Sequence, residues 1–316
     1  MVWLFIGIIM IMRILQSVFS KANTNILSKN GYTYLKYTIY YLFIAGIFAS
    51  FLFIFDIIKG NTIVNIGPTF LYAGISGIAL AICCCCNLYA LSNGTMVLNS
   101  LFGTAGLLVP AIAGIFLFDE FLSIWQWIAI IIFIVGSYFL IGNSKKVYGR
   151  FSIKTLIVLI CSLFSNGITM VMQSLFGRNV TNGNVSLFSL VSFILGSVGI
   201  SIILFILFII IKRKGFSEKQ NSSFNILPKN KCEMNLKNKS LIYGLILAFA
   251  VFVINQLATI STPLISPVIL FSFINGGATI ISAIVGFIIY KEKPNWQSIL
   301  GLILGLGSLI MIKVLA

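Results

Sequence analysis

Of the 316 residues of the chain, 59% are hydrophobic and only 9% are charged, whereas about a quarter of the residues of a soluble domain carry a charge. This composition excludes a soluble globular fold and predicts an all-α integral membrane protein. The net charge of +15 comes from residues that nearly all lie in the connectors between apolar runs, so it suits contact with the anionic headgroups of a lipid bilayer better than with nucleic acid.

Ten apolar runs follow one another along the chain, each of roughly the 17 to 25 residues that a helix needs to cross a bilayer. Their residues do not alternate between polar and apolar as those of a membrane β-barrel do. The runs are residues 2–20, 36–55, 68–91, 95–118, 124–142, 152–174, 185–211, 241–261, 265–290 and 296–315. The sequence therefore predicts ten transmembrane helices in a multi-pass protein of the cell (plasma) membrane.

The two halves of the chain end in the same order of features. The first half ends in an apolar run, an acidic connector with Glu120, the pair Trp125-Gln126 and a last run that carries Gly136-Ser137. The second half repeats this order with Glu292, Trp296-Gln297 and Gly307-Ser308. A second echo marks the start of each unit, because residues 16–21, QSVFSK, return as residues 173–178, QSLFGR. The protein is therefore a doubled unit.

Each unit holds five predicted helices, in residues 1–143 and 144–316. Because five is an odd number, the second unit enters the membrane from the opposite side, which is the inverted-repeat plan of alternating-access carriers. The sequence thus predicts two inverted five-helix repeats. The second repeat carries a basic loop at residues 212–239, which we expect to be flexible because it has few apolar residues.

This five-helix unit, with its acidic turn, Trp-Gln pair and Gly-rich last helix, resembles the EamA domain of the drug/metabolite transporter superfamily, whose ten-helix members carry the domain twice. The resemblance covers nearly the whole chain, and the connectors with Glu120 and Glu292 are its more specific part. It implies a secondary membrane transporter that moves a small metabolite or drug-like solute by alternating access, without identifying the solute.

Polar side chains inside the predicted spans are informative, because each is costly unless it faces protein or a water-filled cavity. Six of the predicted helices, in three repeat-related pairs, carry such residues at helical spacing along one face. The candidate substrate-binding residues on these faces are Arg13, Gln16, Ser17, Asn87, Asn99, Asn166, Thr169, Gln173, Asn255, Asn275 and Thr279. The stripes predict a central cavity, and the alternative is that these groups hydrogen-bond between packed helices.

Arg13 is the one charge near the centre of a predicted span, where an arginine costs roughly 2.5 to 3.5 kcal/mol on insertion scales. Either carbonyl groups at a helix C-terminus satisfy its guanidinium, or it meets an anionic or carboxylate-bearing solute in the cavity. Small multidrug carriers of the same superfamily resemble this stretch but have a glutamate at the position of Arg13. Their exchange of protons for cationic drugs is therefore not implied here.

The residues that the chain lacks bear on its chemistry. It has no histidine, and no Asp or Glu lies in the middle of a predicted span, so a side-chain proton relay has no obvious carrier. The same absence weighs against a membrane-embedded enzyme such as a lipid-modifying transferase, which needs a base or metal ligands. The other alternative to a transporter is a structural or sensory membrane protein without a transport cycle.

Two further motifs have simple interpretations. Residues 83–86 are four consecutive cysteines, which point in all directions around a helix and cannot form one tetrahedral metal site. We therefore expect no metal and no cofactor. Gly301 and Gly305 form a GxxxG motif, which predicts close helix packing within the chain and, secondarily, the face of a homodimer.

Overall fold

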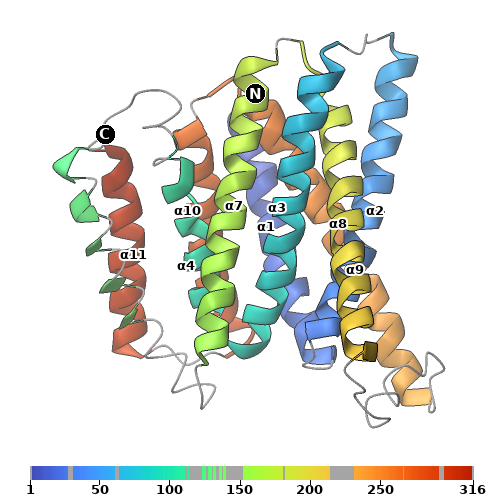
Figure 1. The fold of residues 1–316 in the computed structure, drawn as a ribbon. Helices are drawn as coiled ribbons and strands as arrows, with labels where there is room; N and C mark the ends of the chain where they lie inside the picture. Colours follow the sequence, from blue (N-terminus) through green and yellow to red (C-terminus); the bar gives the residue numbers. More distant parts are fainter. Residues whose placement is uncertain are drawn as a thin grey trace.

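The computed structural model describes most of the chain and shows a bundle of helices (Figure 1). The described residues are 2–27, 31–60, 64–94, 96–110, 113, 123–125, 127–129, 131–132, 135–136, 138–139, 152–180, 182–213, 231–265, 267–291 and 295–314. Over these residues the chain contains helices and no strand. The all-α prediction is therefore confirmed, while the predicted features at Asp119, Glu120, Gln126, Ser137 and Glu292 lie outside the described residues.

The helices with continuous described backbone follow the predicted runs. They are α1 (Val2–Ile26), α2 (Gly31–Ile58), α3 (Ile66–Asn93), α4 (Met96–Ala105), α7 (Ile153–Asn179), α8 (Val185–Arg213), α9 (Lys231–Ser261), α10 (Pro267–Ile288) and α11 (Trp296–Val314). Only short pieces of the predicted helix at residues 124–142 are described. The predicted loop at 212–239 is too long, because α9 already begins at Lys231. Its first residues include Lys, Glu and Met, which favour a helix, and no Gly or Pro.

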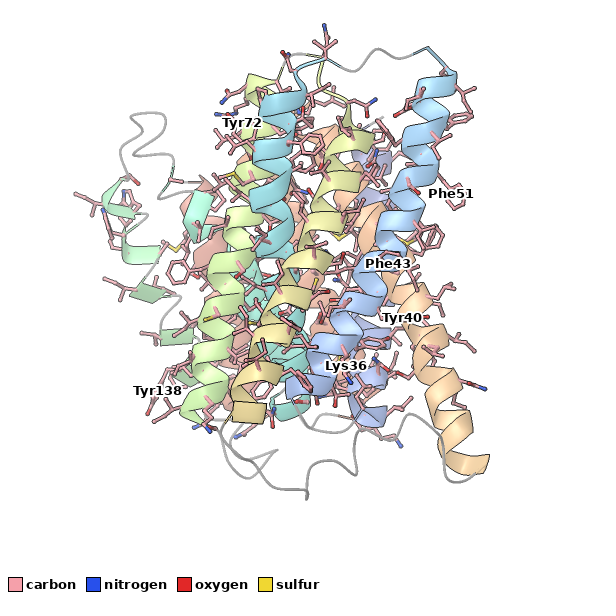
Figure 2. The ribbon with its side chains drawn as sticks, turned by 45° about the vertical axis from the view of Figure 1, so that its right-hand side comes forward. Lys36, Tyr40, Phe43, Phe51, Tyr72 and Tyr138 are labelled. Carbon is pink, nitrogen blue, oxygen red and sulfur yellow. The ribbon has the colours of Figure 1, made fainter. Side chains whose placement is uncertain are left out.

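Six helices of the described chain are long and apolar enough to cross a membrane. They comprise Val2–Ile26, Thr33–Ile58, Ile66–Asn93, Ile153–Asn179, Val185–Ile209 and Asn238–Ser261. Shorter apolar stretches lie at Met96–Pro110, Phe273–Ile288 and Ile299–Ser308. Figure 2 shows Phe43 and Phe51 pointing outward from α2, and these side chains are 60% and 66% exposed. Such an apolar outer face fits lipid and not water, so the chain is a multi-pass membrane protein.

The main helix contacts join the first half of the chain to the second. Helix α3 packs against α7 and α8, α2 against α8 and α9, α1 against α9 and α10, and α4 against α7 and α10. One core cluster accordingly combines Tyr41 and Leu88 with Phe193 and Leu247. The two halves are therefore interleaved and contribute residues to the same core cluster.

Small residues set the closest helix contacts. A Cβ atom on Gly77 of α3 would lie 2.1 Å from the backbone oxygen of Ser192 in α8, so the two helices approach at a distance that only glycine allows. A Cβ atom on Gly136 would lie 2.9 Å from the backbone oxygen of Gly301 and 2.9 Å from the backbone nitrogen of Gly305. The GxxxG face of α11 is therefore covered by a helix of the same chain.

Candidate functional site

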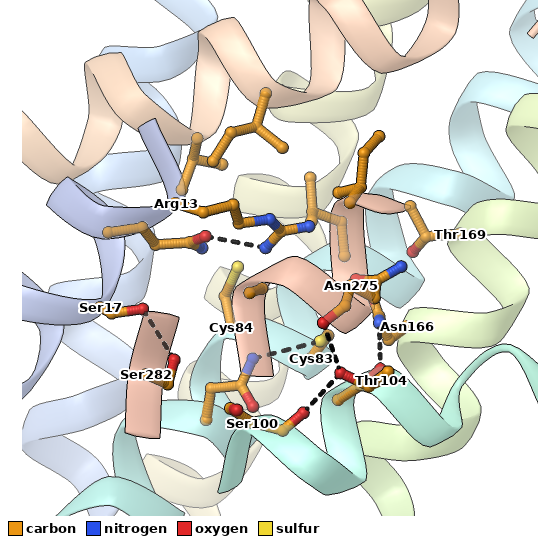
Figure 3. Close-up of a pocket in the computed structure, with 18 of the residues that line it drawn as sticks. Arg13, Ser17, Cys83, Cys84, Ser100, Thr104, Asn166, Thr169, Asn275 and Ser282 are labelled. Carbon is orange, nitrogen blue, oxygen red and sulfur yellow. Dashed lines mark hydrogen bonds between the residues drawn. The ribbon is translucent and has the colours of Figure 1, made fainter. Parts of the chain in front are cut away.

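A cavity of about 130 Å³ lies among α1, α3, α4, α7, α9 and α10, the six helices that carry the predicted polar stripes. Figure 3 shows Arg13 reaching into it from α1, while Ser100 and Thr104 come from α4. Ten of the eleven predicted site residues line the cavity: Arg13, Gln16, Ser17, Asn87, Asn99, Asn166, Thr169, Gln173, Asn255 and Asn275. The structure thus brings together residues that are up to 262 positions apart in the sequence, from Arg13 to Asn275.

Thr279 is the predicted site residue that does not line the cavity. It is fully buried, and its hydroxyl shares a hydrogen bond with that of Thr104, which does line the cavity. Thr279 lies one helical turn beyond Asn275, and at this point α10 packs directly against α4. It therefore belongs to the layer behind the lining.

The sequence interpretation missed Ser100 and Thr104, both of which line the cavity. They lie four residues apart on α4, so they share one helical face, which adjoins the face of the predicted Asn99 stripe. That spacing is the signal that would have found them.

Two of the four consecutive cysteines, Cys83 and Cys84, also line the cavity. In the described part of the chain, no group of three or more His, Cys, Asp or Glu side chains could hold a metal ion.

Arg13 lies in the cavity wall with part of its guanidinium unused. Its Nη1 donates a hydrogen bond of 2.8 Å to Oε1 of Gln16, one turn further along α1. Its Nε is buried and has no hydrogen-bond partner among the described residues. The predicted alternative, an arginine satisfied by helix C-terminal carbonyls, is therefore not what the described chain shows. Within the described part of the chain, no Asp or Glu is among the residues that line the cavity.

Several carboxamide side chains of the lining also hold helices together. Ser162 of α7 donates a hydrogen bond of 2.8 Å to Oδ1 of Asn87 on α3. Nε2 of Gln173 on α7 donates to Oδ1 of Asn255 and to Oγ1 of Thr259 on α9, at 3.1 and 3.2 Å. These residues therefore do both things that the sequence allowed, because they line the cavity and bridge packed helices.

The part of the cavity formed by α4 has an irregular backbone. Regular α-helix ends at Ala105, and Gly106 N donates to the carbonyl of Gly103, three residues back, at 3.2 Å. Nδ2 of Asn166 donates to the same Gly103 carbonyl at 2.6 Å. Within the lining of this region, Oδ1 of Asn99 and Oγ of Ser100 are buried without a hydrogen-bond partner in the described chain.

One end of the cavity is fastened by bonds from the second half of α1. Oγ of Ser17 lies 3.1 Å from Oγ of Ser282 on α10. The Tyr290 hydroxyl donates a hydrogen bond of 2.7 Å to the carbonyl of Val18. Lys21, only 5% exposed, donates through Nζ to the carbonyl of Leu91 at the end of α3. These contacts therefore tie three helices together at this end of the bundle.

The position that corresponds to Lys21 in the sequence echo is Arg178, and its surroundings differ. Arg178 is exposed, and it lines a separate cavity of about 380 Å³ together with Thr259 and Pro263. The buried Lys21 and the exposed Arg178 show that the two sequence-related positions adopt different environments in this one structure.

Comparisons with known proteins inform the fold. No protein-family model matches the chain, and no curated protein matches it. Among solved structures, the crystal structure of another protein aligns over 98% of this chain and 96% of its own, with a TM-score of 0.57 and 12% sequence identity. At this identity the likeness shows the fold alone. The arrangement of helices along the whole chain therefore also occurs in a solved protein, and the function has to be argued from the cavity.

Proposed function

We propose that the protein is a secondary transporter that carries a small polar solute across the membrane through the cavity among the six helices, by alternating access. The observation that carries this proposal is a cavity lined by ten of the predicted polar residues inside a bundle whose outer face is apolar. Polar and ionisable groups inside a membrane bundle are costly, and ionisable ones that face its interior mark substrate or ion pathways, among other functional sites. A solely structural bundle gains nothing from keeping Arg13 beside a cavity.

We further propose that the chain consists of two inverted five-helix repeats, and the helix contacts support this. The proposed counterparts are α1 and α7, α2 and α8, α3 and α9, and α4 and α10. Exchanging each helix for its counterpart turns the contact of α1 with α9 into that of α7 with α3, and the contact of α2 with α9 into that of α8 with α3. All four contacts are present.

The course of the chain gives further support. In Figure 1, α1 and α7 run in opposite directions along the bundle, and α3 and α9 do the same. The start of α1 and the end of α11 lie at one end of the bundle, as an even number of crossings requires. Counterparts that run in opposite directions are the mark of a repeat inverted in the membrane.

Alternating access requires that the two repeats hold different conformations and exchange them. The difference between buried Lys21 and exposed Arg178 supports such an asymmetry. In the alternative state, the bonds that Ser17, Val18 and Lys21 make with Ser282, Tyr290 and Leu91 would be released, and the end near Arg178 would close.

Reconstitution tests the proposal. Liposomes that contain the purified full chain and liposomes without protein are loaded with a metabolite extract, diluted, and compared for the solutes that they lose. We expect selective and saturable loss of a small set of polar solutes from the protein-containing liposomes only. Equal losses from both preparations, in both directions of the gradient, would refute a transporter.

A further inference from the structure

We infer that the solute is a small carboxylate anion that also carries a hydroxyl group, with Arg13 binding the carboxylate and Asn99 and Ser100 receiving the hydroxyl. This inference rests on the proposed function, because it names the solute class of the same cavity. It is carried by the hydrogen-bonding groups of the lining that have no partner within the described chain.

The charge of the lining points to an anion. Among the described residues, Arg13 is the only permanently charged side chain that lines the cavity, and a guanidinium keeps its proton at any physiological pH. A cation would meet like charge here, and a neutral solute would leave the buried charge without compensation. One guanidinium matches one negative charge, as on a carboxylate, whereas a phosphate monoester carries about 1.5 to 2 negative charges at neutral pH.

The free edge of Arg13 matches the shape of a carboxylate. Gln16 occupies Nη1, which leaves Nε and Nη2, the two nitrogens whose N–H bonds lie parallel on one edge of the guanidinium. Nε is already buried without a partner among the described residues. Two parallel N–H donors bind the two oxygens of a carboxylate side by side, which is the strongest arrangement for this pair. Gln16 is a positioning residue, since it fixes the orientation of this edge.

The groups on α4 call for a hydrogen-bond donor. Oδ1 of Asn99 can only accept a hydrogen bond, and Oγ of Ser100 can donate or accept. Both are buried and have no partner in the part of the chain that the structure describes. A hydroxyl of the solute would satisfy both of them. An ammonium group fits less well, because no Asp or Glu of the described residues lines the cavity to balance its charge.

The size of the cavity limits the solute to a few carbon atoms. The volume of about 130 Å³ lies below the roughly 300 to 1,000 Å³ that is usual for pockets holding drug-sized ligands. A two- to four-carbon hydroxy acid has the charge, the donor and the size that the lining selects.

Binding to the purified full chain in detergent tests the inference without relying on transport. The probes are L-lactate, propionate without the hydroxyl, lactamide without the charge, L-alanine with an ammonium in place of the hydroxyl, and inorganic phosphate. We expect L-lactate to bind tightest, propionate to bind about two- to tenfold more weakly, and the other three to bind at least about tenfold more weakly than L-lactate.

Substitutions assign the two contacts. Arg13→Met should weaken L-lactate binding about tenfold or more, and Arg13→Lys should restore it only in part, because an ammonium cannot make the two-pronged contact. Asn99→Leu should weaken L-lactate binding to the level of propionate and leave propionate binding unchanged. Lys154→Met is the matched control, because Lys154 is exposed near the start of α7 and its loss removes the same charge outside the cavity.

We expect Arg13→Met to fold, because methionine already occupies the corresponding position of the second repeat. When residues 16–21 are aligned with residues 173–178, Arg13 corresponds to Met170 of α7. The inference is overturned if L-lactate binds no tighter than lactamide, if L-alanine or phosphate binds tighter, or if a folded Arg13→Met variant keeps full affinity. The liposome assay separates the two proposals. Flux of a neutral or cationic solute without L-lactate binding rejects only the solute class, whereas Arg13-dependent L-lactate binding without flux of any solute rejects only the transporter.

Discussion

Nζ of Lys21 donates a hydrogen bond of 2.8 Å to the carbonyl oxygen of Leu91, 70 residues away in the sequence. A second bond of 3.3 Å reaches the carbonyl of Gly94, which follows the end of α3. The last carbonyls of a helix lack intrahelical partners and carry a partial negative charge. A buried lysine is therefore stabilised here by a helix end, and it fastens α1 to α3.

Replacing Lys21 by Met should loosen this end of the cavity. Loss of the two bonds should lower the free energy of unfolding by about 1–3 kcal/mol and shift the protein toward the state in which this end is open. We expect a cysteine introduced as Ser282→Cys to react with a water-soluble maleimide about threefold faster or more in the Lys21→Met background. Arg178→Met is the control from the corresponding position, and an equal acceleration in it would contradict a specific fastening by Lys21.

The tight crossing of α3 and α8 should make the fold sensitive at one glycine. In Gly77→Ala, the new methyl group would lie 2.1 Å from the backbone oxygen of Ser192, so the helices must separate, at a cost of about 1–3 kcal/mol. In Gly7→Ala, no atom lies within 4 Å of the new methyl group, and stability should be unchanged or slightly raised. Unfolding midpoints of both variants in detergent check this, and similar shifts would contradict the close approach.

The polar stripes could be predicted from a single sequence. A polar residue within an apolar run is recognisable by its cost in lipid, and the helical period shows which of these residues share a face. Asn87 and Asn255 were found in this way, and both line the cavity. Which face of a helix meets which neighbour is a tertiary property, and it decided the outcome at Thr279, which packs against α4 instead of facing the cavity. The end of regular helix at Ala105 was equally hidden, because hydropathy continues through it.

Lys21 illustrates a second limit. Because Lys21 directly follows the predicted run at residues 2–20, the sequence places it in a connector. It donates hydrogen bonds to carbonyl groups at a helix end, 70 and 73 residues away. Every residue has a backbone carbonyl, so the sequence does not show which of them accepts such a bond. A buried lysine of this kind can be recognised only once the helices are placed.

The cavity should bind its solute with little dependence on pH near neutrality. The chain has no histidine, no Asp or Glu among the described residues lines the cavity, and Arg13 keeps its proton. L-lactate also keeps its charge, since an α-carboxyl group has a pKa of about 3.3–3.7. We expect the dissociation constant to change less than about twofold between pH 5.5 and 7.5, and binding to weaken as the pH falls through the carboxyl pKa. A larger change of the dissociation constant between pH 5.5 and 7.5 would contradict this prediction, because it would reveal a titrating group of the protein at the site.

The contact between Ser17 and Ser282 offers a reversible lock on the proposed transport cycle. Their Oγ atoms lie 3.1 Å apart, so cysteines at both positions can approach the short Cβ–Cβ separation that a disulfide needs. In the Ser17→Cys/Ser282→Cys variant, oxidation should join α1 to α10 and abolish flux in liposomes, because the end that must open is then held shut. Reduction should restore the flux.

Each single cysteine variant and the unmodified chain, treated with the same oxidant, control for the native cysteines and for the loss of one hydroxyl. Flux that continues undiminished while the disulfide is present would show that α1 and α10 do not separate during transport. The alternating-access proposal would then fail at this end of the cavity, even if the solute still passes through the protein.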